Sequence, residues 1–125
     1  MNEILWIVQI LLALVFLMSG FMKATQPLDK LSGMMKWIPD FPPTIIRVIG
    51  VLEVLAGVGL ILPMLTNILP ILTPLAAVGL VLTMIGAIIT HARRSEFSVL
   101  WVNVVFLLMA AFVAYGRFVA LPVQM

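Results

Sequence analysis

Four apolar stretches, each about 20 residues long, constrain the fold of this chain more than any other feature. They cover residues 4–23, 44–63, 71–92 and 97–116, with proline-rich or charged breaks between them. An α-helix of about 20 apolar residues crosses the hydrocarbon core of a bilayer with its backbone hydrogen bonds satisfied internally. Composition agrees, because 64% of the residues are hydrophobic and 10% are charged, whereas soluble domains have about 25% charged residues. The sequence predicts an all-α membrane protein, a single membrane domain over residues 1–125 in contact with lipid.

The connection between the first two spans is the only long one, and its pattern is amphipathic. Apolar side chains recur on one helical face, namely Leu28, Leu31, Met35 and Ile38. Polar side chains fall on the other faces, namely Asp29, Lys30, Ser32 and Lys36. This pattern predicts a short amphipathic helix over residues 28–38 that lies in the membrane interface, with Trp37 at headgroup level. Because Gly33 weakens the helix, an irregular loop is the alternative.

The distribution of basic residues predicts the orientation of the spans. One side of the membrane receives the basic residues of the first and third connections, which are Lys23, Lys30, Lys36, Arg93 and Arg94. The other side receives only Arg117 and the α-amino group. Since cytoplasmic connections carry the excess of Lys and Arg, both termini are expected outside the cytoplasm. The first span lacks the basic start and the cleavage site of a signal peptide, so we expect it to be retained.

Small and polar residues recur along each span at three- and four-residue spacing, which places them on one stripe of each helix. In the third span this stripe contains Ala76, Gly79, Thr83, Gly86 and Thr90. Small residues let membrane helices approach closely, and the spacing suits left-handed packing. The sequence predicts a left-handed four-transmembrane-helix bundle with packing glycines at Gly20, Gly50, Gly57, Gly79 and Gly86. The alternative is that glycine is merely frequent in membrane helices.

Glu53 lies in the middle of the second span, where an ionised carboxylate facing lipid would cost several kcal/mol. We therefore expect its side chain to face the bundle interior, either protonated or paired with a cation. The candidate partners for an interior polar site are Lys23, Arg47, His91 and Asn103. The alternative is that the basic side chains extend to the headgroups and that Glu53 is a hydrogen-bonded packing residue.

Several classes of site are disfavoured by the sequence. There is no cysteine, so thiolate metal sites and thiol–disulfide exchange are excluded. A single histidine and scattered carboxylates do not form a metal-ligand set, and we expect no metal site. Seven basic residues, widely scattered, form no nucleic-acid patch. No covalently bound cofactor is expected either, since there is no haem ligand pair or flavin fingerprint.

Three segments resemble the DoxX-like family. The first, "LALVFLMSGFMKATQP", contains Phe16, Ser19, Gly20 and Lys23. The second, "RVIGVLEVLAGVGLILP", contains Arg47, Gly50, Glu53, Gly57 and Pro63, and the third, "MIGAIITHARR", contains Met84, Ala87 and His91. The resemblance covers essentially the whole chain and implies a four-helix protein of the bacterial inner (plasma) membrane. The family takes its name from a subunit of an archaeal thiosulfate:quinone oxidoreductase, while similar proteins belong to oxidative-stress complexes or act as receptor-assembly chaperones.

Three functions are compatible with these features. The first is a redox-linked accessory subunit that binds a quinone or another lipophilic ligand at the polar site around Glu53 and works with a partner redox subunit. The second is a non-catalytic membrane scaffold or assembly chaperone that binds partner helices, and a homo-oligomer is compatible with both. The third and least favoured is a small proton-coupled transporter. Because no residue could itself hold electrons, the chain is not expected to be an enzyme on its own.

Overall fold

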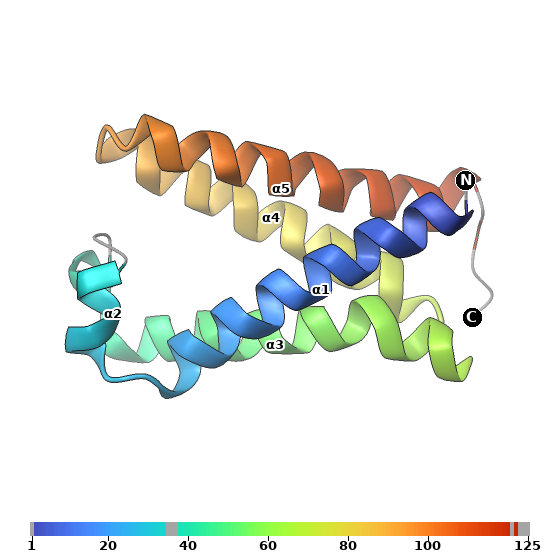
Figure 1. The fold of residues 1–125 in the computed structure, drawn as a ribbon, viewed down its shortest axis with the longest axis horizontal. Helices are drawn as coiled ribbons and strands as arrows, with labels where there is room; N and C mark the ends of the chain where they lie inside the picture. Colours follow the sequence, from blue (N-terminus) through green and yellow to red (C-terminus); the bar gives the residue numbers. More distant parts are fainter. Residues whose placement is uncertain (1, 35–37, 121, 123–125) are drawn as a thin grey trace.

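The computed structural model describes residues 2–34, 38–120 and 122, and the described residues are almost entirely helical. Four helices are long: α1 (Asn2–Thr25), α3 (Pro43–Thr66), α4 (Leu72–Arg93) and α5 (Phe97–Tyr115). Two short helices, α2 (Leu28–Met34) and η1 (Ile38–Asp40), connect α1 to α3, and a π-helical turn, η2 (Gly116–Ala120), continues α5. Figure 1 shows the long helices packed in a bundle. The predicted all-α fold is confirmed.

Each long helix is long and apolar enough to cross a membrane. Mean hydropathy is between 2.3 and 2.5 in the four candidate spans, which are Asn2–Thr25, Pro43–Thr66, Leu72–Arg93 and Phe97–Ala120. The outward faces carry large apolar side chains such as Ile7, Leu82 and Leu108, with exposed fractions of 58%, 65% and 61%. Apolar surface of this extent is suited to lipid rather than water. The chain is a multi-pass membrane protein, and the four predicted spans coincide closely with these helices.

The four long helices form two pairs that diverge. α1 packs most extensively against α3, and α4 against α5, while the contact between α1 and α5 is smaller. We call α1 with α3 the first pair and α4 with α5 the second pair. Figure 1 shows that the pairs separate toward the end that carries α2, and come together where α1 begins and α5 ends. We call these the open end and the closed end. The predicted left-handed sense of the bundle stays a prediction.

Glycines bring the helices of the first pair into close contact. A Cβ atom on Gly20 would lie 2.5 Å from the carbonyl oxygen of Gly50, and one on Gly50 would lie 2.6 Å from the amide nitrogen of Ala24. At Gly57 a Cβ atom would lie 2.7 Å from Cγ of Leu17. Any larger residue at these three positions would push α1 and α3 apart, because interiors leave no room for added atoms.

The expected packing role is wrong for the two glycines of α4. No heavy atom lies within 4 Å of a Cβ built on Gly79 or Gly86, and both residues are exposed. The face of α4 that is buried carries larger residues, including Ala77, Leu80 and Met84. These side chains fill the space between the helices, so the small-residue stripe of α4 is turned away from the packed face. Ala76, at the start of that stripe, does approach another helix, since its Cβ would lie 3.0 Å from a Cβ on Gly59.

The helix in the first connection is shorter than predicted, and its position in the membrane interface stays a prediction. α2 ends at Met34, and Ile38 belongs to the separate helix η1. Leu31 and Ile38 are buried together with Ile46, as the predicted apolar face requires. The expected positions of Met35, Lys36 and Trp37 lie outside the described residues.

Candidate functional site

A cavity of about 690 Å³ lies between the two pairs, on the side of the open end. The first pair contributes Phe16, Ser19, Lys23, Ile49 and Glu53 to its walls, among others. The second pair contributes Thr83, Met84, Gly86, Ala87, Thr90, His91, Asn103 and Phe106, among others. Apolar atoms make up most of the surface of these walls. The cavity therefore brings four of the five predicted polar-site residues to its walls, and Arg47 is the exception.

Lys23 and Glu53 form an ion pair on the wall made by the first pair. Nζ of Lys23 lies 2.7 Å from Oε1 of Glu53, and the two side chains are 11% and 3% exposed. The close approach of α1 and α3 positions them, because a Cβ on Gly50 would lie 2.8 Å from Cβ of Lys23. Glycine at the crossing point thus allows two charged side chains from different helices to meet inside the membrane span.

The second carboxylate oxygen of Glu53, Oε2, has no hydrogen-bond partner in the part of the chain that the structure describes. Oε2 is buried, and no hydrogen bond reaches it from the described residues. A buried carboxylate oxygen without a partner costs free energy, because the hydrogen bonds it made to water are not replaced. Glu53 lines the cavity, so this unsatisfied acceptor belongs to a residue that a ligand in the cavity would contact.

Arg47 does not join this pair. Its Nη1 donates a hydrogen bond of 2.9 Å to the backbone carbonyl of Lys23. The last four carbonyl groups of a helix lack partners within the helix, and a cation there is favoured by the helix dipole. Arg47 therefore caps the end of α1 and fixes the backbone from which the Lys23 side chain extends.

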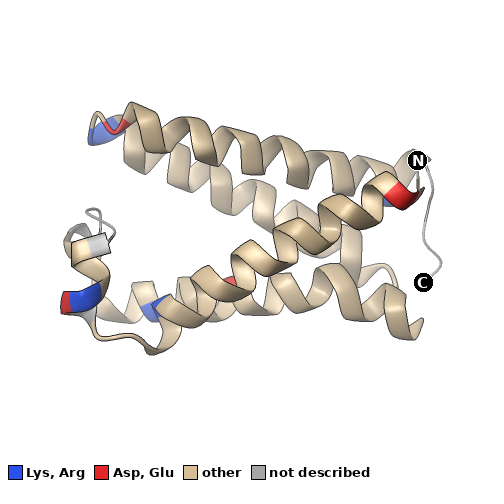
Figure 2. Ribbon diagram, in the orientation of Figure 1, with Lys and Arg blue, Asp and Glu red and all other residues tan. Residues whose placement is uncertain are grey.

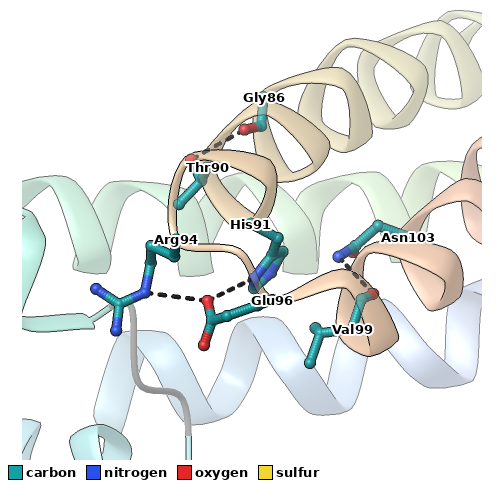
Figure 3. A network of polar contacts seen from close by, with 7 residues as sticks. All are labelled: Gly86, Thr90, His91, Arg94, Glu96, Val99 and Asn103. Carbon is teal, nitrogen blue, oxygen red and sulfur yellow. Dashed lines mark hydrogen bonds and ion pairs between the residues drawn. The ribbon is translucent and has the colours of Figure 1, made fainter.

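The opposite wall carries a second polar group at the open end. Figure 3 shows Glu96 between His91 and Arg94. Nδ1 of His91 and Nε of Arg94 each lie 3.0 Å from the same oxygen, Oε1 of Glu96. The hydrogen bond to His91 holds the pKa of the Glu96 carboxyl below its ordinary value of 4.5, and Arg94 lowers it further. Asn103 lies nearby and donates a hydrogen bond of 3.2 Å to the carbonyl of Val99 in its own helix.

Glu96 is a cavity residue that the sequence pattern did not single out. The signal that could have identified it is the tight turn between α4 and α5. Ser95 adopts a left-handed backbone conformation with φ of 57°, and the amide of Glu96 donates to the carbonyl of His91. This reversal returns Glu96 to the side of His91 although the two residues are five positions apart.

The closed end holds a separate polar cluster around Gln9 and Arg117. Nε2 of Gln9 donates to the carbonyl of Leu60 over 2.7 Å, while its Oε1 accepts a hydrogen bond of 2.7 Å from Nε of Arg117. Arg117 also donates to Oδ1 of Asn2 over 2.8 Å and lies over the ring of Trp6. This cluster joins α1, α3 and η2. Figure 2 shows most other basic residues at the open end, and the orientation of the termini stays a prediction.

The comparisons with known proteins decide the family. The model of the DoxX-like family matches residues 7–113, which include the cavity and parts of all four long helices. The chain belongs to the DoxX-like family. No curated protein and no solved structure matches this DoxX-like protein.

Proposed function

We propose that this DoxX-like protein binds a small amphipathic molecule of the quinone–quinol class in the cavity between the two pairs. The observation that carries the proposal is the position of Glu53 on the cavity wall, because its buried Oε2 has no hydrogen-bond partner among the described residues. A quinol hydroxyl is a neutral hydrogen-bond donor on an apolar ring, and it matches an acceptor in apolar surroundings.

The size and lining of the cavity support this class of ligand. Binding sites for small molecules have volumes of about 300–1,000 Å³, with apolar walls and a few polar groups that fix orientation. The cavity volume of about 690 Å³ falls in this range. Ring contacts are available from Phe16 and Phe106, whose centroids are 5.7 Å apart in an edge-to-face arrangement.

The charge of the site favours a neutral ligand over a cation. Lys23 already lies against Glu53, so the pair has no net charge. A cationic substrate would gain little Coulomb energy from a neutral pair and would lose its hydration in the cavity. We therefore propose that this protein is an accessory subunit that holds a quinol for a partner carrying the redox centre, and that it is not a transporter of cations.

The test uses a methylnaphthoquinone without a side chain, in its reduced and oxidised forms, with the protein in lipid nanodiscs. Native mass spectrometry measures the fraction of protein that carries the probe as its concentration is raised. We expect Glu53→Gln to weaken quinol binding by roughly tenfold to hundredfold, because a hydrogen bond to a charged group contributes about 1.5–3 kcal/mol. The oxidised probe accepts hydrogen bonds but donates none, so its affinity should fall less than that of the quinol in Glu53→Gln.

Two glycine variants provide a steric test of the same site. Gly86→Leu should abolish binding of both forms, because Gly86 lines the cavity and has open space beside it. Gly33→Leu adds the same side chain at a glycine with equally open space outside the cavity, and should leave binding unchanged. Absence of binding to the wild type, or equal binding to the wild type and Gly86→Leu, contradicts the proposal.

A further inference from the structure

We infer that His91 is a second ligand-binding residue of the cavity, and that Glu96 orients its ring for this role. This role rests on the proposed function and adds a contact on the wall opposite Glu53. His91 lies near the end of α4 and lines the cavity together with Glu96. A ligand held by both Glu53 and His91 bridges the two helix pairs at the open end.

The imidazole ring of His91 is bound to the protein through one nitrogen. The side chain is 8% exposed, and its Nδ1 lies 3.0 Å from Oε1 of Glu96 (Figure 3). Its other nitrogen, Nε2, has no hydrogen-bond partner among residues 2–34, 38–120 and 122. The fully enclosed, unpartnered side-chain atoms of these residues do not include Nε2. This nitrogen is therefore accessible from open space, and the cavity is the space that His91 lines.

Glu96 determines which ring nitrogen of His91 carries the proton. The same oxygen of Glu96 also accepts a hydrogen bond of 3.0 Å from Nε of Arg94. The hydrogen bonds from His91 and Arg94 hold the pKa of the Glu96 carboxyl below its ordinary value of 4.5. An ionised carboxylate only accepts hydrogen bonds, so Nδ1 of His91 is the donor. In the neutral ring Nε2 then has a free lone pair and accepts a hydrogen bond.

A structural role at the turn explains only one of the two ring nitrogens. Backbone hydrogen bonds already hold this turn, since the amide of Glu96 donates to the carbonyl of His91 over 2.8 Å and the amide of Ser95 to the carbonyl of Ala92 over 3.1 Å. A nearly buried acceptor without a donor costs free energy, which a ligand hydroxyl offsets. With acceptors at both Glu53 and His91, the cavity favours the reduced ligand, because an oxidised quinone donates no hydrogen bond.

The test compares methylnaphthoquinol with its monomethyl ether, in which a methoxy group replaces one of the two hydroxyls. Native mass spectrometry from nanodiscs measures both affinities at about pH 8, at which free imidazole is neutral. We expect the wild type to bind the quinol about threefold to tenfold more tightly than the ether, the effect of one hydrogen bond between neutral groups. The ether still binds, because its remaining hydroxyl can reach Glu53.

Two substitutions of His91 separate ligand binding from the contact with Glu96. The side-chain amide of Asn lies near the position of Nδ1, so His91→Asn keeps a donor for Glu96 and removes the acceptor at Nε2. We expect His91→Asn to bind the quinol and the ether within about twofold of each other, with the affinity for the ether close to that of the wild type. Gln extends its amide oxygen toward the position of Nε2, so His91→Gln should retain the preference for the quinol. Gly33→Leu, outside the cavity, should match the wild type with both probes.

The contrary outcomes each overturn the role of His91 in a recognisable way. A preference for the quinol that persists in His91→Asn places the second acceptor elsewhere. Loss of the preference in His91→Gln as well as in His91→Asn excludes Nε2 as the acceptor. Equal binding of the two probes to the wild type refutes the contact with His91 and leaves the site at Glu53 intact. Failure of both probes to bind the wild type would refute the proposed function as well, so the two failures are distinguishable.

Discussion

At the scale of single residues, the Lys23–Glu53 ion pair places two ionisable side chains inside the helix bundle. Both groups are removed from water, and each is stabilised chiefly by the other over 2.7 Å. Such a pair contributes little net stability relative to apolar residues of similar size, yet removal of one partner leaves a buried charge. The pair therefore constrains which substitutions the first pair of helices can accept.

Replacing one member of this pair should be more damaging than replacing both. Lys23→Met leaves the Glu53 carboxylate without its cation, and we expect a loss of about 3–5 kcal/mol in the free energy of unfolding. The double variant Lys23→Met with Glu53→Met should recover most of that loss. Unfolding by SDS in mixed micelles, monitored by circular dichroism, measures both. The single variant Glu53→Met completes the comparison. If the loss of unfolding free energy in the double variant equals the sum of the losses in the two single variants, the two charges do not interact energetically.

Glu96 gives the protein a pH dependence with a definite sign. The folded-state pKa of this carboxyl is lowered, chiefly by its hydrogen bond to His91, so its stabilising effect is present above the unfolded value of 4.5. That effect is lost as the pH falls below 4.5 through the lowered folded-state pKa. Glu96→Gln should therefore show a flatter decline of the melting temperature on acidification than the wild type. Parallel declines of the two proteins would contradict this assignment.

The sequence allowed some of these residues to be identified and not others. Glu53 is conspicuous because a carboxylate within an apolar span needs an interior position, and Lys23 lies on the small-residue stripe of the neighbouring span. The bond between Gln9 and Arg117 joins positions 108 residues apart. No local pattern specifies that contact, because it depends on how the ends of α1 and η2 meet after the bundle has formed.

At the scale of elements, α3 contains a proline whose missing amide is compensated by another helix. Pro63 cannot donate the helical hydrogen bond that the carbonyl of Gly59 would accept. The hydroxyl of Thr73, in α4, donates to that carbonyl over 2.7 Å instead. Beyond Pro63 the helix ends at Asn67, which adopts the left-handed conformation typical of a helix C-terminus. The two helices are thereby held together near their short connection.

This compensation can be measured as a coupling between two substitutions. Thr73→Val removes the hydroxyl with little change in shape and should cost about 1 kcal/mol, since the partly buried carbonyl of Gly59 loses its donor. Pro63→Ala restores the helical amide, so Thr73→Val should cost much less in that background. Free energies of unfolding for the wild type, both single variants and the double variant give the coupling. If Thr73→Val lowers the free energy of unfolding equally in the wild type and in Pro63→Ala, Thr73 does not compensate for the missing amide of Pro63.

The elements themselves were the most predictable part of the fold. Hydropathy and length specify where membrane helices lie, and the small-residue stripes of the first and second spans correctly marked their buried faces. The same reasoning failed for α4 because a small residue is tolerated both where helices touch and where nothing touches them. Gly79 and Gly50 have the same sequence signal, and only tertiary packing separates them.

At the scale of the whole molecule, the closed end acts as the fixed point about which the two pairs diverge. Arg117 and Gln9 join α1, α3 and η2 there, and a Cβ on Gly116 would overlap the side chain of Leu5. The open end instead contains the cavity between the two helix pairs, and the Lys23–Glu53 ion pair lies within the first helix pair. The two helix pairs should therefore move relative to each other more freely at the open end than at the closed end.

Spin-label distances test this difference directly, because the chain has no cysteine that would interfere with labelling. One pair of labels replaces Ile4 and Tyr115 near the closed end, and another replaces Phe21 and Trp101 near the open end, all at exposed positions. We expect a narrow distance distribution for the labels near the closed end and a broad one for the labels near the open end. Saturation with the methylnaphthoquinol should narrow only the distance distribution at the open end. Equal widths at the two ends would argue against a fixed closed end.

The divergence of the helix pairs also has a mechanical consequence. A protein that is wider at one end displaces more area in one leaflet than in the other. Movement of the two pairs toward each other would return area to that leaflet alone, so lateral pressure there performs work on the cavity. We therefore expect lipids that favour curvature of that leaflet to change how closely the two pairs approach each other at the open end, without touching the polar site. The composition of the bilayer should then affect the size of the cavity, alongside the residues that line it.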